Sequence, residues 1–280
     1  MGTRNMGAEV AARFGLKFGL ALLGLLACGI AAGQDGKGHP ALTDRWMFQL
    51  GAYVPNVETV AYLNSASGAR GTSISFEEDL NLTDRKTMPA ILASVRLGER
   101  WKVEGEYFSL HRSGSRSVSK TIDWGDNTYP IGATVSSEFD SDIFRLSVGY
   151  SFIKDSQREL GVALGLHVTD FKASLSAAAV GVRSEDALAP LPTIGLYGAY
   201  AFTPKWLLSG RLDYFSLNYE DYEGTLVNFT VGVDYRFSRH FGIGLGFRHV
   251  DYDVTLTKTH YNGGIQYKFN GPVFYAVTSF

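Results

Sequence analysis

The sequence is poor in cysteine and proline, since its 280 residues include one cysteine and eight prolines. The lone cysteine, Cys28, has no partner within the chain, which excludes a fold held by internal disulfide bonds. Net charge is small as well, because 26 basic residues stand against 28 acidic ones and leave −2. No basic stripe runs through the chain, so the composition argues against a nucleic-acid partner.

The sequence also lacks a phosphate-binding glycine loop, although glycine is abundant at 32 residues. The stretch FGIGLGF (241–247) has glycine at every second position, whereas a dinucleotide loop needs G-x-G-x-x-G followed by a helix. Strict alternation is typical of a β-strand, with the large residues on one face and the glycines on the other. The acidic segment at 77–79 does not have the spacing of a calcium loop. We therefore expect no cofactor and no metal.

The N-terminus has the pattern of an export signal. Basic residues precede an apolar run at 18–27 and small residues follow it, which predicts a signal peptide over residues 1–33. The run is too short to favour a permanent membrane helix. Cys28 ends the stretch LLAC, which resembles a lipobox, so lipidation at Cys28 is the alternative to conventional cleavage. Residues 34–44 are expected to form a short periplasmic segment.

Alternating segments recur along the rest of the chain. In each, one face is apolar and aromatic, while the other carries glycine, serine and charge. The strongest segments are about ten residues long, the length that a tilted strand needs to cross a bilayer. A soluble sandwich would show the same alternation, so periodicity alone does not decide. The segments are 143–152, 160–168, 227–237 and 241–247, with weaker ones at 45–55, 88–97, 100–111, 191–202, 206–217 and 262–280.

The connections between these segments favour a membrane barrel. Tight turns at 98–99, 154–157, 203–205 and 238–239 alternate with long polar stretches, as in outer-membrane barrels. The long stretches are 56–86, 112–141, 171–190, 218–225 and, shorter, 256–263. Aromatic residues bracket the tight turns, where their rings would meet the membrane interface. These predicted interface aromatics are Trp46, Trp101, Tyr150, Phe152, Phe202, Trp206, Phe237, Phe241 and Phe280.

The predicted fold is all-β: a transmembrane antiparallel up-and-down barrel over 45–280, with about ten strands and with eight or twelve as alternatives. Ten strands require 262–280 to be one strand, and we expect a bulge at Gly271–Pro272. The bulge would let Tyr267 and Phe274, which have opposite parity, both face lipid. Segments 116–124 and 128–137 are predicted to form a hairpin that projects beyond the membrane.

The stretch NTYPIGATVSSEFDSDIFRLSVGYSF (127–152) and the terminal GPVFYAVTSF are similar to a group of bacterial outer-membrane barrels of unassigned function. The chain resembles the small OmpA-like outer-membrane β-barrels. The resemblance implies localisation in the outer membrane of a Gram-negative bacterium, with bilayer lipid and lipopolysaccharide as surroundings. The terminal phenylalanine, Phe280, resembles the assembly signal of this class, which implies folding by the barrel-assembly machinery.

The face opposite the apolar one is predicted to line the lumen. Its charges must pair or meet water, because an isolated buried charge costs several kcal/mol. Two interpretations stay open: a polar network that fills the barrel, or a narrow channel for small solutes with a slight anion preference. The predicted lumen residues are Arg96, Lys102, Glu104, Glu106, Arg145, His167, Arg211, Asp213, Asp234, Arg236, Arg248 and Lys268.

A third hypothesis is an outer-membrane hydrolase acting on lipid or peptide. His249, Asp251 and Asp253 share one parity near the outer end of a strand, as acid and histidine sites in barrel proteases do. The second acidic pair of such proteases has no counterpart in the sequence, so a solvated rim cluster is favoured. We therefore expect a monomeric barrel without catalytic residues, with a structural or surface-interaction role.

Overall fold

The computed structural model describes residues 38–219, 222–258 and 261–280. The predicted signal peptide, including Cys28, lies outside these residues. One short helix, α2 (Pro40–Thr43), precedes the strands. The strands are β1 (Trp46–Tyr53), β2 (Asn56–Leu63), β3 (Ile74–Ser75), β4 (Met88–Leu97), β5 (Trp101–Ser117), β6 (Ile122–Trp124), β7 (Asn127–Tyr129), β8 (Thr134–Lys154), β9 (Arg158–Ala177), β10 (Gly181–Ala201), β11 (Trp206–Tyr219), β12 (Tyr222–Arg236), β13 (Phe241–Lys258) and β14 (Tyr261–Ser279).

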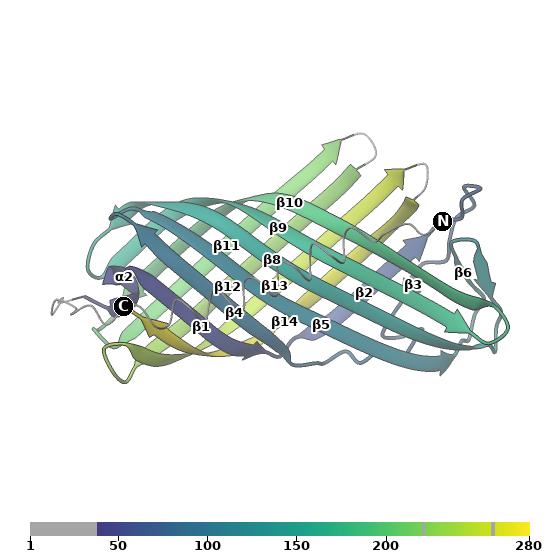
Figure 1. The fold of residues 1–280 in the computed structure, drawn as a ribbon, viewed down its shortest axis with the longest axis horizontal. Coiled ribbons are helices and arrows are strands. Elements are labelled where there is room, and N and C mark those ends of the chain that lie inside the picture. Colours follow the sequence, from purple (N-terminus) through teal and green to yellow (C-terminus); the bar gives the residue numbers. More distant parts are fainter. Residues whose placement is uncertain (1–37, 220–221, 259–260) are drawn as a thin grey trace, which may run out of the picture.

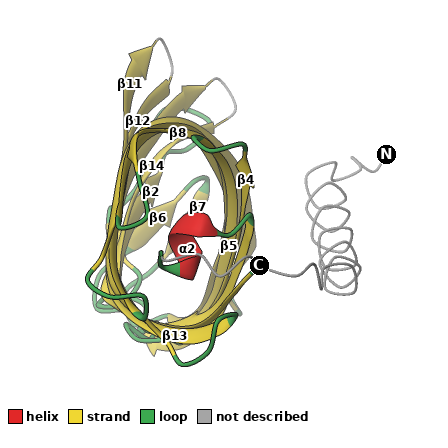
Figure 2. Ribbon diagram, turned by 90° about the vertical axis from the view of Figure 1, so that its left-hand side faces the viewer, coloured by secondary structure: helices red, strands yellow, loops and turns green. Residues whose placement is uncertain are grey.

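The long strands form one antiparallel ring, as predicted, while β6 and β7 form a separate two-stranded sheet (Figures 1 and 2). Each long strand pairs with its neighbours along the chain, and β1 closes the ring by pairing with β14. β1 and β2 pair with successive parts of β14, at 273–279 and 263–270, so together they form one wall strand interrupted at Val54–Pro55. With β1 and β2 counted together, the wall has ten strands: this one, β4, β5 and β8 to β14.

The apolar face of the predicted segments points out of the ring. Glycine, serine and charged residues of the same strands point inward, so the alternation in the sequence becomes two faces of one wall. Such a broad exposed apolar surface is stable only in contact with lipid. Its members include Leu50, Leu97, Leu146, Val148, Leu164, Ile194, Leu208, Ile243, Leu245 and Phe274. In the part of the chain that the structure describes, no helix is long and apolar enough to span a bilayer.

The strands continue well beyond this apolar band, so the predicted long loops are wrong in large part. Segments 112–141 and 171–190 are mostly the ends of β5, β8, β9 and β10, and 56–63 is β2. In these extensions the apolar residues lie on the inner face and the polar ones on the outer face, the reverse of the membrane band. On β8, for example, Phe139 is fully buried while Asp140 and Asp142 face outward. Because their outer face is polar, the sequence of these strand extensions resembles that of loops. We call the end with the short turns the periplasmic end and the opposite end the outer end.

The predicted bulge in β14 is also wrong. β13 and β14 pair without a register shift from Phe241 to Lys258, so β14 is regular throughout. Tyr267 and Phe269 point inward and are fully buried, whereas Phe274 points outward. A bulge is not needed to bring both sets of apolar residues to lipid, because the outer half of the barrel has an apolar interior that takes up Tyr267 and Phe269. Lys268 correspondingly lies on the outside, paired with Asp251 at 3.2 Å.

The predicted hairpin exists as β6 and β7, but it is shorter and it packs back onto the barrel. Ile122, Trp124 and Tyr129 are buried in the same cluster as the outer interior residues. Gly125 has a positive φ of 60° at the turn, and its amide donates to the Leu63 carbonyl at the end of β2. The hairpin thus covers the outer end instead of projecting, while α2 lies within the ring at the periplasmic end (Figure 2).

Candidate functional site

The interior of the ring is the candidate functional site, and α2 occupies its periplasmic mouth (Figure 2). Pro40 at the first helical position suits the start of a helix, and His39 caps it by accepting from the Ala41 amide at 3.2 Å. Leu42 is buried against Ala201 and Leu207 of the wall. A four-residue helix is not stable alone, so these wall contacts must hold it in place.

Polar contacts join the segment 39–44, which includes α2, to three strands of the wall and one turn. Arg96 of β4 donates to the Ala41 carbonyl at 2.9 Å, and Lys154 of β8 donates to the Leu42 carbonyl. Asp44 pairs with Arg239 through both carboxylate oxygens and accepts from the Ser279 hydroxyl at 2.7 Å. The segment is therefore tied to the wall on several sides of the mouth.

His39 is the titratable group of this segment that burial perturbs most. The pKa of His39 is lowered from 6.5 to about 4, mainly by burial and then by the charge of Arg236, while Asp44 acts in the opposite direction. The imidazole is fully buried against these groups, so its charged form loses hydration on docking. The docked segment therefore holds His39 neutral at pH 7.

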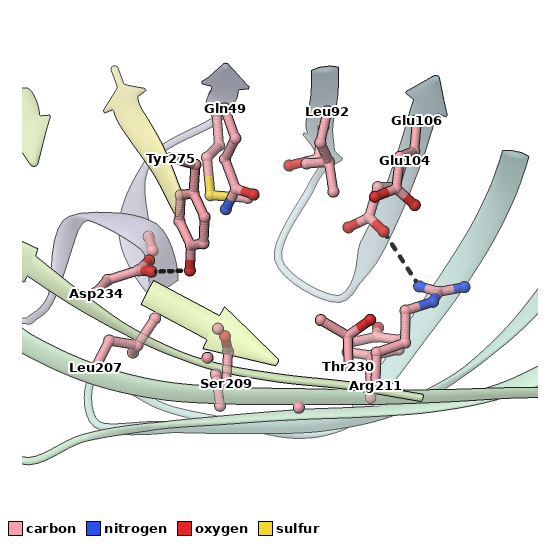
Figure 3. A pocket seen from close by; sticks show the side chains of 18 of the residues that line it. Gln49, Leu92, Glu104, Glu106, Leu207, Ser209, Arg211, Thr230, Asp234 and Tyr275 are labelled. Atoms are coloured by element: carbon pink, nitrogen blue, oxygen red, sulfur yellow. Dashed lines mark hydrogen bonds and ion pairs between the residues drawn. The ribbon is translucent and has the colours of Figure 1, made fainter. Parts of the chain in front are cut away.

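Above α2 lies a cavity of about 160 Å³, lined by polar side chains of the wall and by α2 itself (Figure 3). Tyr275 of β14 donates to Asp234 of β12 on one side of it, while Glu104 of β5 faces Arg211 of β11 on another. Gly244 of β13 creates space for Tyr275, since a Cβ there would lie 2.2 Å from the ring, and a Cβ on Gly242 or Gly246 would lie 2.5 or 2.8 Å from a carbonyl oxygen of β12. The alternating glycines of FGIGLGF therefore have a packing role.

An ion-pair network fills the middle of the barrel. Arg145 of β8 is its centre, bonded to Glu104 at 2.5 Å and to Glu106 at 2.9 Å. Glu106 also binds Arg248 at 2.6 Å, and Glu104 binds Arg211 at 3.3 Å. Each of these five side chains has an oppositely charged partner on another strand, so this network crosses the lumen without an isolated charge.

The network continues in both directions along the axis. Arg211 pairs with Asp213 at 2.7 Å, and Asn228 donates to Asp213 and accepts from Arg248. Nearer the periplasmic mouth, Arg96 binds both oxygens of Glu159 at 2.6 and 2.7 Å. Buried ion pairs of this kind are costly to break, because removing one partner leaves the other charge unpaired and desolvated.

The outer half of the interior is an aromatic core, which we define as Phe108, Phe139, Phe171, Tyr252, Tyr267 and Phe269. The rings lie 5.0 to 6.3 Å apart, centroid to centroid, where they contact one another. Arg248 stacks over Phe108 at 4.4 Å and joins this core to the ion-pair network. Tyrosine hydroxyls bond to wall hydroxyls, as Tyr267 does with Ser141 at 2.9 Å. The core thus fills the ring above the network.

A segment between β3 and β4 closes the outer end beside the hairpin. Arg112 of β5 is almost fully buried there, and it binds Glu77 and donates to the Thr59 hydroxyl at 2.6 Å. Phe76 packs on Trp124 of the hairpin and on Phe139 of the aromatic core. Among the described residues, no group of three or more His, Cys, Asp or Glu side chains is placed to hold a metal ion.

A family model described as outer membrane protein beta-barrel domain matches residues 18–269. The chain belongs to the outer membrane protein β-barrel family. This family member therefore lies in the outer membrane of a Gram-negative bacterium, as its apolar band and alternating turn lengths predict. No curated protein sequence matches the chain.

Solved structures share the fold of this barrel protein. The outer membrane protease OmpT of Escherichia coli gives a TM-score of 0.57 at 12% identity, over 85% of this chain and 97% of that one. The translocator domain of the autotransporter NalP of Neisseria meningitidis gives 0.44 at 14% identity, over 96% and 97%. The P. putida toluene transporter TodX gives 0.36 at 12% identity, over 86% and 92%. At 12% identity the likeness to OmpT concerns the fold alone.

The barrel protein places all the predicted lumen residues inside the ring except Lys268, and it brings most of them into contact. His167 lies next to Thr193, at 3.4 Å, and Arg236 donates to the His240 carbonyl at 3.2 Å. Lys102 lies over the Tyr197 ring at 4.1 Å. The predicted interface aromatics all lie on the outer face near the short turns, although Trp46 and Phe280 are half-buried beside Phe48.

The predicted histidine and acid cluster does not face the interior. His249, Asp251 and Asp253 alternate with the buried Val250 and Tyr252, so all three point away from the aromatic core. They lie on the outer surface of β13.

Sequence reasoning missed α2, Glu159 and the aromatic core. Glu159 follows the turn at 154–157. It lies two and four positions before Gly161 and Ala163, on the same inward face of β9, and this spacing is the sequence signal that predicts its place inside. The sequence signal for the aromatic core lies within β8. Phe139 is at an odd position and Phe144 at an even one, so the two aromatic side chains lie on opposite faces of the same strand.

Proposed function

We propose that the protein is a non-enzymatic outer-membrane barrel with a closed lumen, which acts as a structural element and interacts with other molecules through its outer surface. One observation carries this proposal: α2, the ion-pair network and the aromatic core follow one another along the interior, and the cavity of about 160 Å³ above α2 lies between these closures. An aromatic core leaves no path of water for an ion, and the charges of the ion-pair network are already neutralised by one another.

Conductance in planar bilayers tests the closed lumen. Refolded mature protein is expected to give no discrete conductance steps, under conditions in which a general porin inserted in the same bilayers gives steps. Steps that shift when Arg145→Gln or Arg236→Gln neutralises a lumen charge would contradict the proposal and would support the narrow anion-preferring channel.

Absence of hydrolysis is part of the same proposal. The orientation of His249 supports it, because the side chain faces away from the interior, beside Asn270 of β14. The wild type is expected to leave phospholipid and unstructured peptide intact over a long incubation. Cleavage of either substrate that His249→Ala abolishes would instead support an outer-membrane hydrolase.

The proposed partners follow from the outer face. The apolar band contacts bilayer lipid, and the strand extensions stand among the lipopolysaccharide molecules of the outer leaflet. The C-terminal strand, β14, closes the ring against β1, which supports its recognition by the barrel-assembly machinery. The pairing of β1 with β14 closes the wall as a ring within one chain, and we propose a monomer without a nucleic-acid partner.

A further inference from the structure

A groove lies on the outer surface of the wall at the outer end, away from the interior described above. β12, β13, β14 and β2 are neighbours there, and residues of the segment 64–73 complete its edge. Its volume is about 430 Å³. Because the groove opens sideways above the apolar band, a ligand could enter it from the outer leaflet.

The floor of the groove carries a flat aromatic ring. Tyr62 of β2 lies against Gly264 of β14, and a Cβ on Gly264 would be 2.6 Å from the Tyr62 ring. Only glycine lets the ring lie flat on the strand in this way. Neighbours of opposite parity on β2, Ala61 and Leu63, are buried inside, so the Tyr62 side chain is on the outer face. An aromatic face of this kind packs well against the C–H groups of a sugar ring.

Hydrogen-bonding groups surround the ring. Asp253 of β13 and Glu223 of β12 supply carboxylate oxygens, and Thr225 supplies a hydroxyl. Gln266 of β14 donates to Asp253 at 3.1 Å and holds that carboxylate in position. A carboxylate that accepts from hydroxyl groups makes stronger hydrogen bonds than a neutral acceptor. The lining therefore matches a ligand that offers many hydroxyl donors and a flat apolar face.

The charge of the lining restricts the ligand further. Glu223 and Asp253 contribute two negative charges and Arg70 one positive charge, a balance of −1 for the described lining. Like charges would repel a sulfated or phosphorylated ligand at short range. The groove therefore favours uncharged sugars.

The height of the groove indicates where such sugars come from. Phe247, 45% exposed, is the last outward aromatic residue on β13 before His249, and Asp253 lies six positions further along the strand. A strand that rises about 3.3 Å per residue and tilts by about 40° places Asp253 roughly 15 Å beyond the apolar band. That is the layer in which the saccharide of lipopolysaccharide stands.

We propose that this groove binds neutral hexose units in the core saccharide of lipopolysaccharide molecules that surround the barrel. The proposal rests on the proposed surface-interaction role and gives it a ligand. Tyr62 would pack on a sugar ring, while Asp253 and Thr225 would bond its hydroxyls.

Titration calorimetry with core oligosaccharide released from lipopolysaccharide tests this proposal on refolded protein in detergent. Asp253→Asn and Tyr62→Leu are each expected to weaken binding by about tenfold, the value of one charge-assisted hydrogen bond or one ring contact. Asp251→Asn is the matched control, because it lies two positions away on the same face of β13, pairs with Lys268 and does not line the groove. Its affinity should equal that of the wild type. Heat-modifiable mobility on gels shows which variants are folded.

Three results would overturn the proposal: no binding by the folded wild type, equal loss in Asp253→Asn and Asp251→Asn, or tighter binding of a sulfated oligosaccharide than of the neutral one. The last would indicate a polyanion site around Arg70 instead. Conductance of the same preparation is a separate measurement. A failure of sugar binding leaves the closed lumen standing, and conductance steps would leave the measured sugar affinity unchanged.

Discussion

At the scale of single residues, the buried ion pairs are the most sensitive points of the barrel. Arg145 neutralises Glu104 and Glu106 in the middle of the lumen, and its side chain is 2% exposed. Arg145→Met keeps an unbranched apolar stem but removes the guanidinium, so each carboxylate loses one partner. We expect a loss of about 3–5 kcal/mol in the free energy of unfolding, measured by urea titration in lipid vesicles.

Lys268→Met is the control for Arg145→Met, because Lys268 also pairs with an acid but has a 45% exposed side chain. An exposed pair contributes about 0–1 kcal/mol, so this variant should unfold close to the wild type. The double variant Arg145→Met with Glu104→Gln should recover part of the loss, since it removes one of the two buried carboxylates that Arg145 neutralises. Equal losses in the Arg145 and Lys268 variants would refute the importance assigned to the network.

At the scale of strands, the wall divides at its outer end between β10 and β11. These strands pair only over Ile194–Ala201 and Leu207–Tyr214, although both continue further, and they diverge in Figure 1. Pro190 and Pro192 lie in β10 just beyond the last pair. Proline has no amide hydrogen to give a neighbouring strand, so it occurs at strand edges. The two prolines thus end the pairing and protect the free edge of β10 from other strands.

Replacing both prolines should extend the pairing. In Pro190→Val with Pro192→Val, the β10 amides can reach β11 at 215–218, so amide exchange of that segment is expected to slow by at least tenfold. Mass spectrometry of deuterium uptake measures this in detergent. Pro89→Val, in β4 on another part of the wall, should leave the uptake at 215–218 unchanged. Unchanged exchange in the double variant would show that something other than proline separates the strands.

The same strands show how far the sequence predicts the fold. The ten-strand wall and the inward charges such as Arg145 and Glu104 could be predicted, because alternation with a period of two assigns faces wherever one face meets lipid. The faces of the outer half could not be predicted, because the period stays at two while the apolar residues move from the outer face of the wall to the inner face. Tyr267 and Lys268 were therefore placed on the wrong faces. α2 could not be predicted either, because four residues with one buried leucine have no periodicity.

At the scale of the whole molecule, the lumen is closed twice, by α2 at the periplasmic mouth and by the aromatic core at the outer half. The two closures differ in their response to pH. His39, which faces Arg236, Asp44 and Arg239, has its pKa lowered to about 4 in the docked segment, whereas the free segment titrates near 6.5. Docking is therefore fully stable above pH 6.5 and weakens as the pH falls from 6.5 to 4, by at most about tenfold per pH unit. The aromatic core includes no group that gains charge in this window.

Acidification from pH 7 to pH 5 should consequently release α2 without opening the barrel. Deuterium uptake of residues 38–44, corrected for the intrinsic pH dependence of exchange, is expected to rise by up to about twentyfold, while bilayer recordings stay free of steps. His39→Asn retains a cap for the helix but does not titrate, so its corrected uptake should be the same at both pH values. Steps that appear only at pH 5 in the wild type would mean that α2, and not the aromatic core, keeps ions out. Uptake that rises equally in His39→Asn would assign the release to another group.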